Sequence, residues 1–391
     1  MTMEIVKKFK FADFFAGIGG FHQIMTSLGG ECTFACEIDK DAASVYEKNY
    51  GINPLCDIRN VKGKDIGNID VMCGGFPCQG FSIGGKKLGF EDERGTLFFQ
   101  LARLLREKID EGHPVKYLVF ENVKHLLKHD NGNTWLTIKN TLEDLGYVLN
   151  KPIICNPIQL GIPQNRERIL ILGEYQRKTP LCIKNDLPKN QCHNVFDTDF
   201  FLKNVDSKYN LTKYREDVIK MWNEFKVGIG DIGNVVNQKY FRYTNEMIND
   251  IENLDERKVA QKSALIYRKN QQFIEEWEKR WDDLNWVNPS HHRFEWQAGK
   301  KYNNVYECFA QFRQSGLRVK KPDFFPCLVA IVQTSIIPKY NRTLTPRECA
   351  RLQTFPDTFI LHEDDKIAYK QLGNSICIDI LKYFIKQLII L

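Results

Sequence analysis

The chain has 391 residues, of which 43% are hydrophobic and 27% are charged. This composition is typical of a globular protein and excludes a largely disordered chain. Because a typical domain has about 100–200 residues, we expect two or three compact units. Lysine and arginine exceed aspartate and glutamate by 55 − 49 = 6 charges. So small an excess permits a polyanionic partner without requiring one.

No segment has the features of a membrane span or an export signal. A span needs about 18 uninterrupted apolar residues, whereas the stretch 376–391 contains Asp379, Lys382 and Lys386 and predicts an amphipathic helix. The first residues lack the apolar core of a signal peptide, so we expect a cytoplasmic protein. The 12 cysteines include no CxxC pair, and we therefore expect neither a disulfide framework nor a bound metal.

The first 180 residues alternate short apolar runs with helical patterns, which predicts a doubly wound, mostly parallel α/β sheet. Such sheets bind ligands at the carboxyl ends of their strands. We expect strands over 10–15, 32–37, 70–73, 117–121 and 168–172. We expect helices over 21–28, 40–49, 96–109 and 134–145, and a last helix from residue 376.

The character of the sequence changes after residue 180. Five of the six tryptophans follow, at positions Trp222, Trp277, Trp281, Trp286 and Trp296. Phe273, Trp277, Trp281 and Leu284 have the spacing of one helix face, which indicates a hydrophobic core. We therefore expect a catalytic domain at 1–180, a smaller inserted domain at 181–340, and a return to the catalytic domain at 341–391.

The first strand ends in a glycine-rich turn, Asp13-Phe-Phe-Ala-Gly17-Ile-Gly19-Gly20. Glycine lets the backbone approach a ligand closely. A dinucleotide fingerprint needs a further glycine where His22 stands, so a nucleoside ligand without a pyrophosphate fits better. Glu37 ends the second strand and can accept hydrogen bonds from a ribose, and Asp57 can accept one from an adenine. Each acid alone is equally compatible with a solvated carboxylate or a helix cap, but together they indicate an adenosyl cofactor.

A cysteine follows the strand that begins at Asp70, in Cys73-Gly-Gly-Phe-Pro77-Cys78-Gln79-Gly-Phe-Ser82. Proline and glycines hold Cys78 at an exposed strand end, where backbone donors lower a thiol pKa, so it is a candidate nucleophile. Cys73 lies within the apolar strand and is expected in the core.

Two further motifs place charged groups at strand ends. Glu121 ends the run Val119-Phe120-Glu121-Asn122-Val123, and burial there raises a carboxyl pKa so that the group can share a proton near neutrality. It is also compatible with a helix cap. Gln164, Arg166 and Arg168 alternate and are expected on one face. Two guanidiniums there suit phosphate or carbonyl binding or a salt bridge to the acid, and a structural ion pair for one of them stays open.

The order of these motifs resembles that of the DNA cytosine-5 methyltransferases of bacterial restriction–modification systems. The similar blocks are Phe15–Gly20, Gly75–Gln79, Glu121–Val123, Gln164–Arg168, Arg342–Leu352 and Gly373–Ser375. The resemblance covers about residues 10–180 and 340–391. It implies methyl transfer from S-adenosylmethionine to carbon 5 of a flipped cytosine, with S-adenosylhomocysteine as the product.

The resemblance also implies residue roles. Cys78 would attack carbon 6 of cytosine, Glu121 would bind ring nitrogen 3 and the amino group, and Arg168 would hold the base carbonyl with Arg166 in support. The implied catalytic residues are Cys78, Gln79, Ser82, Glu121, Arg166 and Arg168. The implied cofactor-binding residues are Phe15, Ala16, Gly17, Ile18, Gly19, Gly20, Glu37, Ile38, Asp57, Ile58, Pro77, Leu97, Asn374 and Ser375. Ile38 stands where some relatives have a tryptophan, which implies less stacking on the adenine.

Reading of double-stranded DNA would fall to the inserted domain. Its expected DNA-binding residues are Arg293, Arg313, Arg318 and Lys320. A phosphate contact or a solvated face is the alternative for each arginine. The resemblance further implies a bacterial, nucleoid-associated monomer and a separate cognate restriction endonuclease.

Two other functions remain compatible with the same fold. One is a tRNA cytosine-5 methyltransferase, whose members typically carry Pro-Pro-Cys-Gln where this chain has Phe76-Pro77-Cys78-Gln79. The other is a catalytically silent DNA-binding module, which has no chemical need for Cys78, Glu121 and both arginines together.

Overall fold

The computed structural model describes residues 8–77, 97–330 and 334–389. The chain forms two compact units, the first comprising Met1–Cys192, Val329–Ile331 and Cys349–Leu391, and the second His193–Leu328 and Val332–Glu348. These borders lie beyond the expected 180 and 340. Leu181 and Ile183 are buried, and the backbone amide of Ile183 donates to Asn150 Oδ1 at 2.9 Å, which keeps this segment in the first unit. Arg342 stays in the second unit because its strand is part of that unit's sheet.

The first unit contains a seven-stranded sheet in the order β2-β1-β3-β4-β8-β5, with β6 also paired to β8. Its strands are β1 (Phe9–Phe14), β2 (Gly30–Cys36), β3 (Val71–Gly74), β4 (Tyr117–Val123), β5 (Tyr147–Leu149), β6 (Ile153–Cys155) and β8 (Arg168–Tyr175). Strand β8 is antiparallel to each of its neighbours β4, β5 and β6, whereas β1 to β4 pair in parallel. The expected doubly wound, mostly parallel sheet is confirmed.

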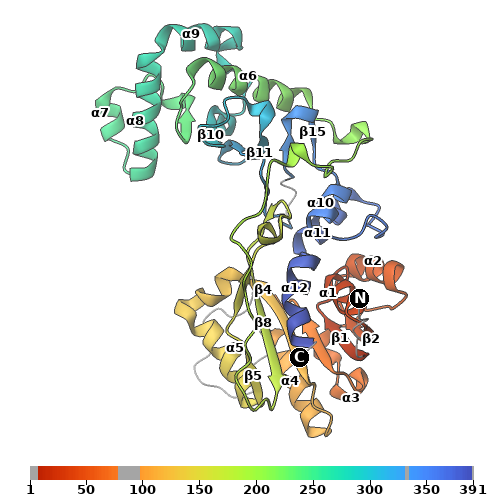
Figure 1. Ribbon diagram of the computed structural model, residues 1–391. Helices are drawn as coiled ribbons and strands as arrows, with labels where there is room; N and C mark the ends of the chain where they lie inside the picture. Colours follow the sequence, from red (N-terminus) through yellow and green to blue (C-terminus); the bar gives the residue numbers. More distant parts are fainter. Residues whose placement is uncertain (1–7, 78–96, 331–333, 390–391) are drawn as a thin grey trace. The chain divides into compact units, whose positions relative to one another are not determined.

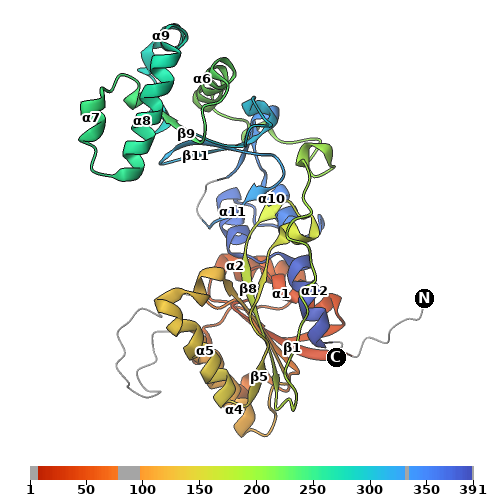
Figure 2. The ribbon, with the colours of Figure 1, turned by 60° about the vertical axis from the view of Figure 1, so that its left-hand side comes forward.

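Helices cover both faces of this sheet because its strands are apolar on both sides. Ala12 and Phe14 face a core shared with α4 (Leu97–Asp110) and α5 (Asn133–Asp144). Helices α1 (Gly20–Ser27) and α12 (Ile378–Ile389) lie together against the opposite face (Figure 1; Figure 2). The remaining elements of this unit are α2 (Lys40–Tyr50), α3 (Gly63–Ile66), β7 (Gln164–Asn165) and α11 (Asp365–Asn374).

The carboxyl ends of β1 to β4 meet at one edge of the sheet, where the sequence motifs lie. Gly74, at the end of β3, allows a close backbone approach there. A Cβ at Gly74 would lie 2.4 Å from the carbonyl oxygen of Phe14, which a side chain cannot relieve by moving. The expected core position of Cys73 is confirmed, because its side chain is fully buried.

The second unit contains a six-stranded sheet in the order β15-β14-β11-β12-β10-β9. Its strands are β9 (Val235–Asn237), β10 (Arg293–Gln297), β11 (Phe309–Arg313), β12 (Gly316–Lys320), β14 (Ile336–Ile337) and β15 (Arg342–Thr343). The helices of this unit are α6 (Lys213–Ile229), α7 (Asn245–Asn249), α8 (Leu254–Lys269) and α9 (Gln271–Arg280) (Figure 1). Strand β13 (Phe325–Pro326) follows β12, and α10 (Pro346–Leu352) contains the border between the units.

The core of the second unit is built on aromatic side chains. Trp222 stacks on Phe294 with ring centroids 4.9 Å apart, and Trp277 is fully buried. The expected core role of the 273–284 stretch is confirmed, since Trp277 and Leu284 are buried and Phe273 and Trp281 pack against the same core. The prediction that these residues lie on one continuous helix as far as Leu284 is wrong. Helix α9 ends at Arg280, because residues 282–284 take left-handed backbone angles with φ of 51–62°.

Among the described residues, no helix is both long enough and apolar enough to cross a membrane.

The glycine at the end of β3 predicts a measurable packing constraint. Gly74→Ala is expected to lower the unfolding free energy by about 1–3 kcal/mol, because its Cβ meets backbone that cannot rotate away. Gly173→Ala on β8 is the control, since its Cβ would come closest to the end of the Leu149 side chain, at 2.8 Å, with Leu118 in ordinary contact at 3.5 Å and no backbone atom among these neighbours. Denaturant unfolding followed by circular dichroism compares them. Equal losses in the two variants would contradict a backbone constraint at Gly74.

Candidate active site and nucleic-acid interface

The conformation of the glycine loop after β1 is fixed by left-handed backbone angles and by hydrogen bonds to Glu37. Phe15, Gly17 and Gly19 have φ of 53°, 55° and 90°, and a Cβ at Gly19 would lie 2.1 Å from the ring of Tyr50. Glu37 Oε2 accepts a hydrogen bond from the amide of Gly17 at 2.8 Å. Its Oε1 accepts one from the amide of Asp39, also at 2.8 Å. Both carboxylate oxygens are therefore fixed, and each keeps a lone pair for a ligand.

This loop forms one wall of a pocket of about 280 Å³ in the first unit. Eleven of the expected cofactor-binding residues line it, namely Phe15, Ala16, Gly17, Ile18, Gly20, Glu37, Ile38, Pro77, Leu97, Asn374 and Ser375. Glu121 lines the same pocket. One cavity therefore joins the expected cofactor residues to the expected acid.

Three expected cofactor residues do not line this pocket. Gly19 contributes to the loop conformation through its left-handed backbone and packs against Tyr50. Ile58 is buried in the core. Asp57 caps a short helical turn by accepting from the amide of Arg59 at 3.0 Å, and its carboxylate also pairs with the Arg59 side chain. The structure thus shows Asp57 as the helix cap that its sequence context allowed, and its contact with an adenine stays a prediction.

Sequence reasoning did not assign several other pocket residues to the cofactor. These are Phe21, Asp39, Ala42, Gly75, Lys370, Gln371 and Ile376. Lys370 pairs with Asp39 at 3.1 Å. Gln371 is 7% exposed, and its Nε2 has no hydrogen-bond partner among the described residues. Lys370 and Gln371 lie one helical turn before Asn374 on α11. This spacing is the sequence signal that could have predicted their place in the pocket.

Glu121 lies two residues before the end of β4, in a buried, charged environment. Burial raises the pKa of this carboxyl, against the opposing effect of the Arg168 and Arg166 guanidiniums. Arg168 Nε lies 2.9 Å from Glu121 Oε1. Arg168 therefore forms the salt bridge to the acid that the sequence left open as one of its roles. A carboxyl with a raised pKa keeps its proton to a higher pH than a solvated carboxyl does.

The loop that leads to the expected nucleophile is tied to the same strand. Asn122, next to Glu121, donates from Nδ2 to the carbonyl of Phe76 at 2.8 Å. The Phe76 ring packs against Phe98 with centroids 5.3 Å apart. Cys78, Gln79 and Ser82 lie outside the described residues. Their last described neighbour, Pro77, lines the pocket beside Glu121.

Gln164, Arg166 and Arg168 contact two different parts of the first unit. Arg166 donates from Nη2 to the carbonyls of Gly373 at 3.0 Å and Ser375 at 2.6 Å. Gln164 donates to the carbonyl of Leu352 at 2.8 Å. Because the strand is interrupted between Asn165 and Arg168, simple alternation does not describe where these side chains point. Arg166 and Gln164 hold the C-terminal segment, and Arg168 holds Glu121.

The four expected DNA-binding residues lie on one face of the second unit's sheet. Strand alternation buries Phe294, Trp296, Leu317 and Val319 in the core, so their neighbours in sequence point the other way. The register places Gln311 and Glu295 on either side of Arg318. We call this surface the arginine face, and it comprises Arg293, Glu295, Gln311, Arg313, Arg318 and Lys320. Burial, together with the charges of Arg318 and Arg313, lowers the pKa of Lys320.

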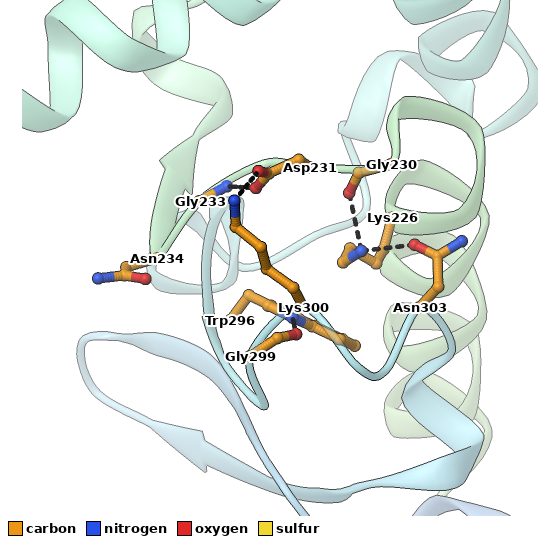
Figure 3. A pocket seen from close by; sticks show the side chains of 9 residues that line it. All are labelled: Lys226, Gly230, Asp231, Gly233, Asn234, Trp296, Gly299, Lys300 and Asn303. Carbon is orange, nitrogen blue, oxygen red and sulfur yellow. Dashed lines mark hydrogen bonds and ion pairs between the residues drawn. The ribbon is translucent and has the colours of Figure 1, made fainter.

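A second pocket, of about 340 Å³, lies in the second unit beside the C-terminal end of α6 (Figure 3). Lys226 donates from Nζ to the carbonyl of Gly230 at 2.7 Å and to Asn303 Oδ1 at 2.6 Å. The same ammonium lies 4.5 Å from the centre of the Trp296 ring. A cation at the end of a helix satisfies its last carbonyls, and Lys226 thus ties α6 to the loops that follow it.

Comparison with known proteins gives the class of this chain. Residues 9–390 match the family model described as C-5 cytosine-specific DNA methylase. The chain belongs to this family and is a DNA (cytosine-5-)-methyltransferase, as the motif order predicted. A catalytically silent module is thereby set aside.

Individual relatives cover nearly the whole chain. It is 32% identical over 374 residues to the Type II methyltransferase M.HhaI of Haemophilus parahaemolyticus, covering 96% of this chain and 92% of the relative. It is 34% identical over 377 residues to the Type II methyltransferase M.HpaII of Haemophilus parainfluenzae, with 95% and 87% covered. These two relatives agree with the restriction–modification type that the motifs resemble.

Solved structures show the same fold. A putative DNA modification methyltransferase encoded within an Escherichia coli prophage matches with a TM-score of 0.59 at 21% identity, covering 97% of this chain and 98% of that chain. The Dnmt2 methyltransferase of S. pombe matches with a TM-score of 0.55 at 18% identity, covering 98% of each chain.

The environment of Glu121 predicts a pH-dependent difference in stability. Because burial raises its pKa above the ordinary 4.5, the folded protein binds this proton more tightly than the unfolded chain. The native protein therefore loses stability as the pH rises from 4.5 through the raised value, by about 1.4 kcal/mol for each pKa unit. Glu121→Gln lacks this loss. The unfolding free energy of the variant minus that of the native protein should therefore increase across that window and stay constant above it. Denaturant titrations from pH 4.5 to 8 measure it, and a constant difference would contradict it.

Proposed function

We propose that this enzyme transfers a methyl group from S-adenosylmethionine to carbon 5 of a cytosine flipped out of a short specific DNA sequence. The observation that carries the proposal is the single pocket that joins the glycine loop and Glu37 to Glu121. A methyl donor and a cytosine that bind in one cavity are held next to each other, away from bulk water. Their relative orientation is therefore set before the reaction. The site lies at the carboxyl ends of β1 to β4, where sheets of this kind bind ligands.

The residues of the pocket fit S-adenosylmethionine. Glu37 presents two fixed oxygens to the ribose hydroxyls. Helix α1 begins at Gly20 with no side-chain cap and no acidic residue in its first turn, so its amides favour the carboxylate of the methionine end. On the α11 side, Gln371 adds a buried amide donor that has no partner among the residues the structure describes. When bound, S-adenosylmethionine supplies the methyl group and leaves as S-adenosylhomocysteine.

The remaining residues account for activation of the base. Carbon 5 of cytosine is a weak nucleophile, and addition of the Cys78 thiolate to carbon 6 makes it an enamine carbon. Glu121 supplies a proton or hydrogen bond at nitrogen 3 while negative charge develops on the ring. Arg168 keeps Glu121 in place and lies near enough to the acid to hold the base carbonyl. After methyl transfer, loss of the proton on carbon 5 to a base such as water expels Cys78 and restores the ring.

Double-stranded DNA is the partner that the arginine face fits, with its three arginines and Lys320 on one sheet surface. Flipping the target base costs a few kcal/mol of stacking, which these contacts offset. A separate restriction endonuclease and a monomeric state stay predictions.

The covalent step predicts a trapped complex. A duplex that contains the recognition sequence with 5-fluorocytosine at the target should become cross-linked to the protein when S-adenosylmethionine is present, because fluorine cannot leave as a proton does. Denaturing gel electrophoresis detects the complex. Cys78→Ser should bind the same duplex and form no cross-link. A cross-link in that variant, or none in the native protein, would contradict the nucleophile.

The unpartnered amide of Gln371 predicts a loss of cofactor affinity. Gln371→Leu removes a donor to a charged acceptor, so the Kd for S-adenosylhomocysteine should rise about tenfold or more. Gln371→Glu should raise it further, because it places a negative charge where a carboxylate is expected. Calorimetric titration without DNA measures binding apart from turnover. Unchanged Kd values in both variants would remove Gln371 from the cofactor site.

A further inference from the structure

A buried carboxylate lies in the middle of the arginine face. Glu295 is 5% exposed, and its Oε2 accepts a hydrogen bond from Arg318 Nε at 2.5 Å. Its Oε1 lies 3.7 Å from Arg293 Nε. A buried carboxylate is costly unless it is paired, so Glu295 and the two guanidiniums hold one another in fixed positions.

The two arginines differ in how much of each guanidinium is engaged. Arg293 also donates from Nη1 to Glu256 Oε2 at 2.9 Å, so it is held between two carboxylates. Arg318 is held at Nε alone. Within the described part of the chain, its two terminal nitrogens donate to no acceptor, and they are not buried. The Arg318 side chain is 21% exposed. One edge of its planar group is thus anchored inside the protein, and the other edge faces outward with two donors.

This arrangement differs from that of an arginine that neutralises phosphate. A nearby carboxylate cancels charge, which weakens attraction to any backbone phosphate. What the carboxylate adds is orientation, since a side chain fixed before binding loses less conformational freedom on contact. The two parallel donors of an arginine match O6 and N7 of guanine in the major groove.

We infer that Arg318 reads a guanine of the target sequence through its two terminal nitrogens, and that Glu295 is the positioning residue that aims it. The inference rests on the proposed function, because it needs duplex DNA on the arginine face. It assigns guanine recognition to the centre of that face, between Gln311 and Glu295 in the sheet register.

The test combines base analogues with variants. Bisulfite sequencing of DNA from cells that express the protein first gives the recognition sequence. Each guanine of that sequence is then replaced in turn by 7-deazaguanine, which lacks the N7 acceptor. At one guanine the native protein should lose roughly tenfold in affinity, whereas Arg318→Ala, already weakened, should lose nothing further there. Equal losses in both proteins at every guanine would overturn the inference.

A phosphate contact by Arg318 gives a different result. Arg318→Ala would then weaken binding to all sequences alike and reduce the salt dependence by about one phosphate contact. That outcome also overturns the inference. Arg318→Lys is the second variant, because it keeps the charge and lacks the two-donor edge. It should lose discrimination at the same guanine while its salt dependence stays that of the native protein.

Glu295→Gln separates positioning from folding. This variant should bind non-specific DNA as well as or better than the native protein, because it loses a negative charge, yet discriminate less at the guanine that Arg318 reads. A purely structural role would lower both together and would overturn the positioning role. Glu278→Gln is the matched control, since Glu278 is also buried and pairs with Arg242 on another part of the unit, and its discrimination should be native. If the native protein methylates no cytosine in DNA, the proposed function itself fails.

Discussion

The hydrogen bonds from Arg166 to the carbonyls of Gly373 and Ser375 complete the candidate active site. The chain leaves the first unit at Cys192 and returns to it at Cys349, apart from the short stretch Val329–Ile331. One wall of the pocket is therefore built from residues distant in sequence from the glycine loop. Gln353 continues the connection by donating to the carbonyl of Leu372 at 2.9 Å. A buried guanidinium with several donors can hold two carbonyls of this turn at once. Backbone carbonyls leave no mark in the sequence, so this contact is visible only in the structure.

The Arg166 guanidinium also affects the pKa of Glu121. One residue therefore acts on both the pocket wall and the candidate catalytic acid. Arg166 and Arg168 both oppose the effect of burial on the pKa of Glu121. Burial favours the protonated carboxyl and the two guanidiniums favour the ionised one, and together they leave the pKa of Glu121 raised. The balance between burial and two positive charges gives a group that can accept and return a proton. Asn122 ties the segment just before Cys78 to the same strand through the carbonyl of Phe76.

The sequence predicted the first unit well because its signals are local. Alternation of apolar strands and helices predicted the sheet, and the glycine loop and Glu37 fell in one pocket as their strand-end positions required. It failed where a side chain had two possible partners, or where the chain turned without a glycine or a proline. Asp57 and Glu37 looked alike in sequence, yet Asp57 has Arg59 two positions away and pairs with it. Helix α9 ends at Arg280 because left-handed residues follow it, which aromatic spacing cannot reveal.

The second unit shows the same limit in its charged residues. Sequence reasoning selected Arg293 and Arg318 together as equivalent cations, and the sheet register does place both on one face. Their difference comes from Glu256, on helix α8, which engages Arg293 and leaves Arg318 with its outer edge open. A single acidic partner from a neighbouring element thus leaves the two arginines with different guanidinium nitrogens open to a ligand. Charge counting cannot make this distinction, because it depends on which guanidinium nitrogens are already used.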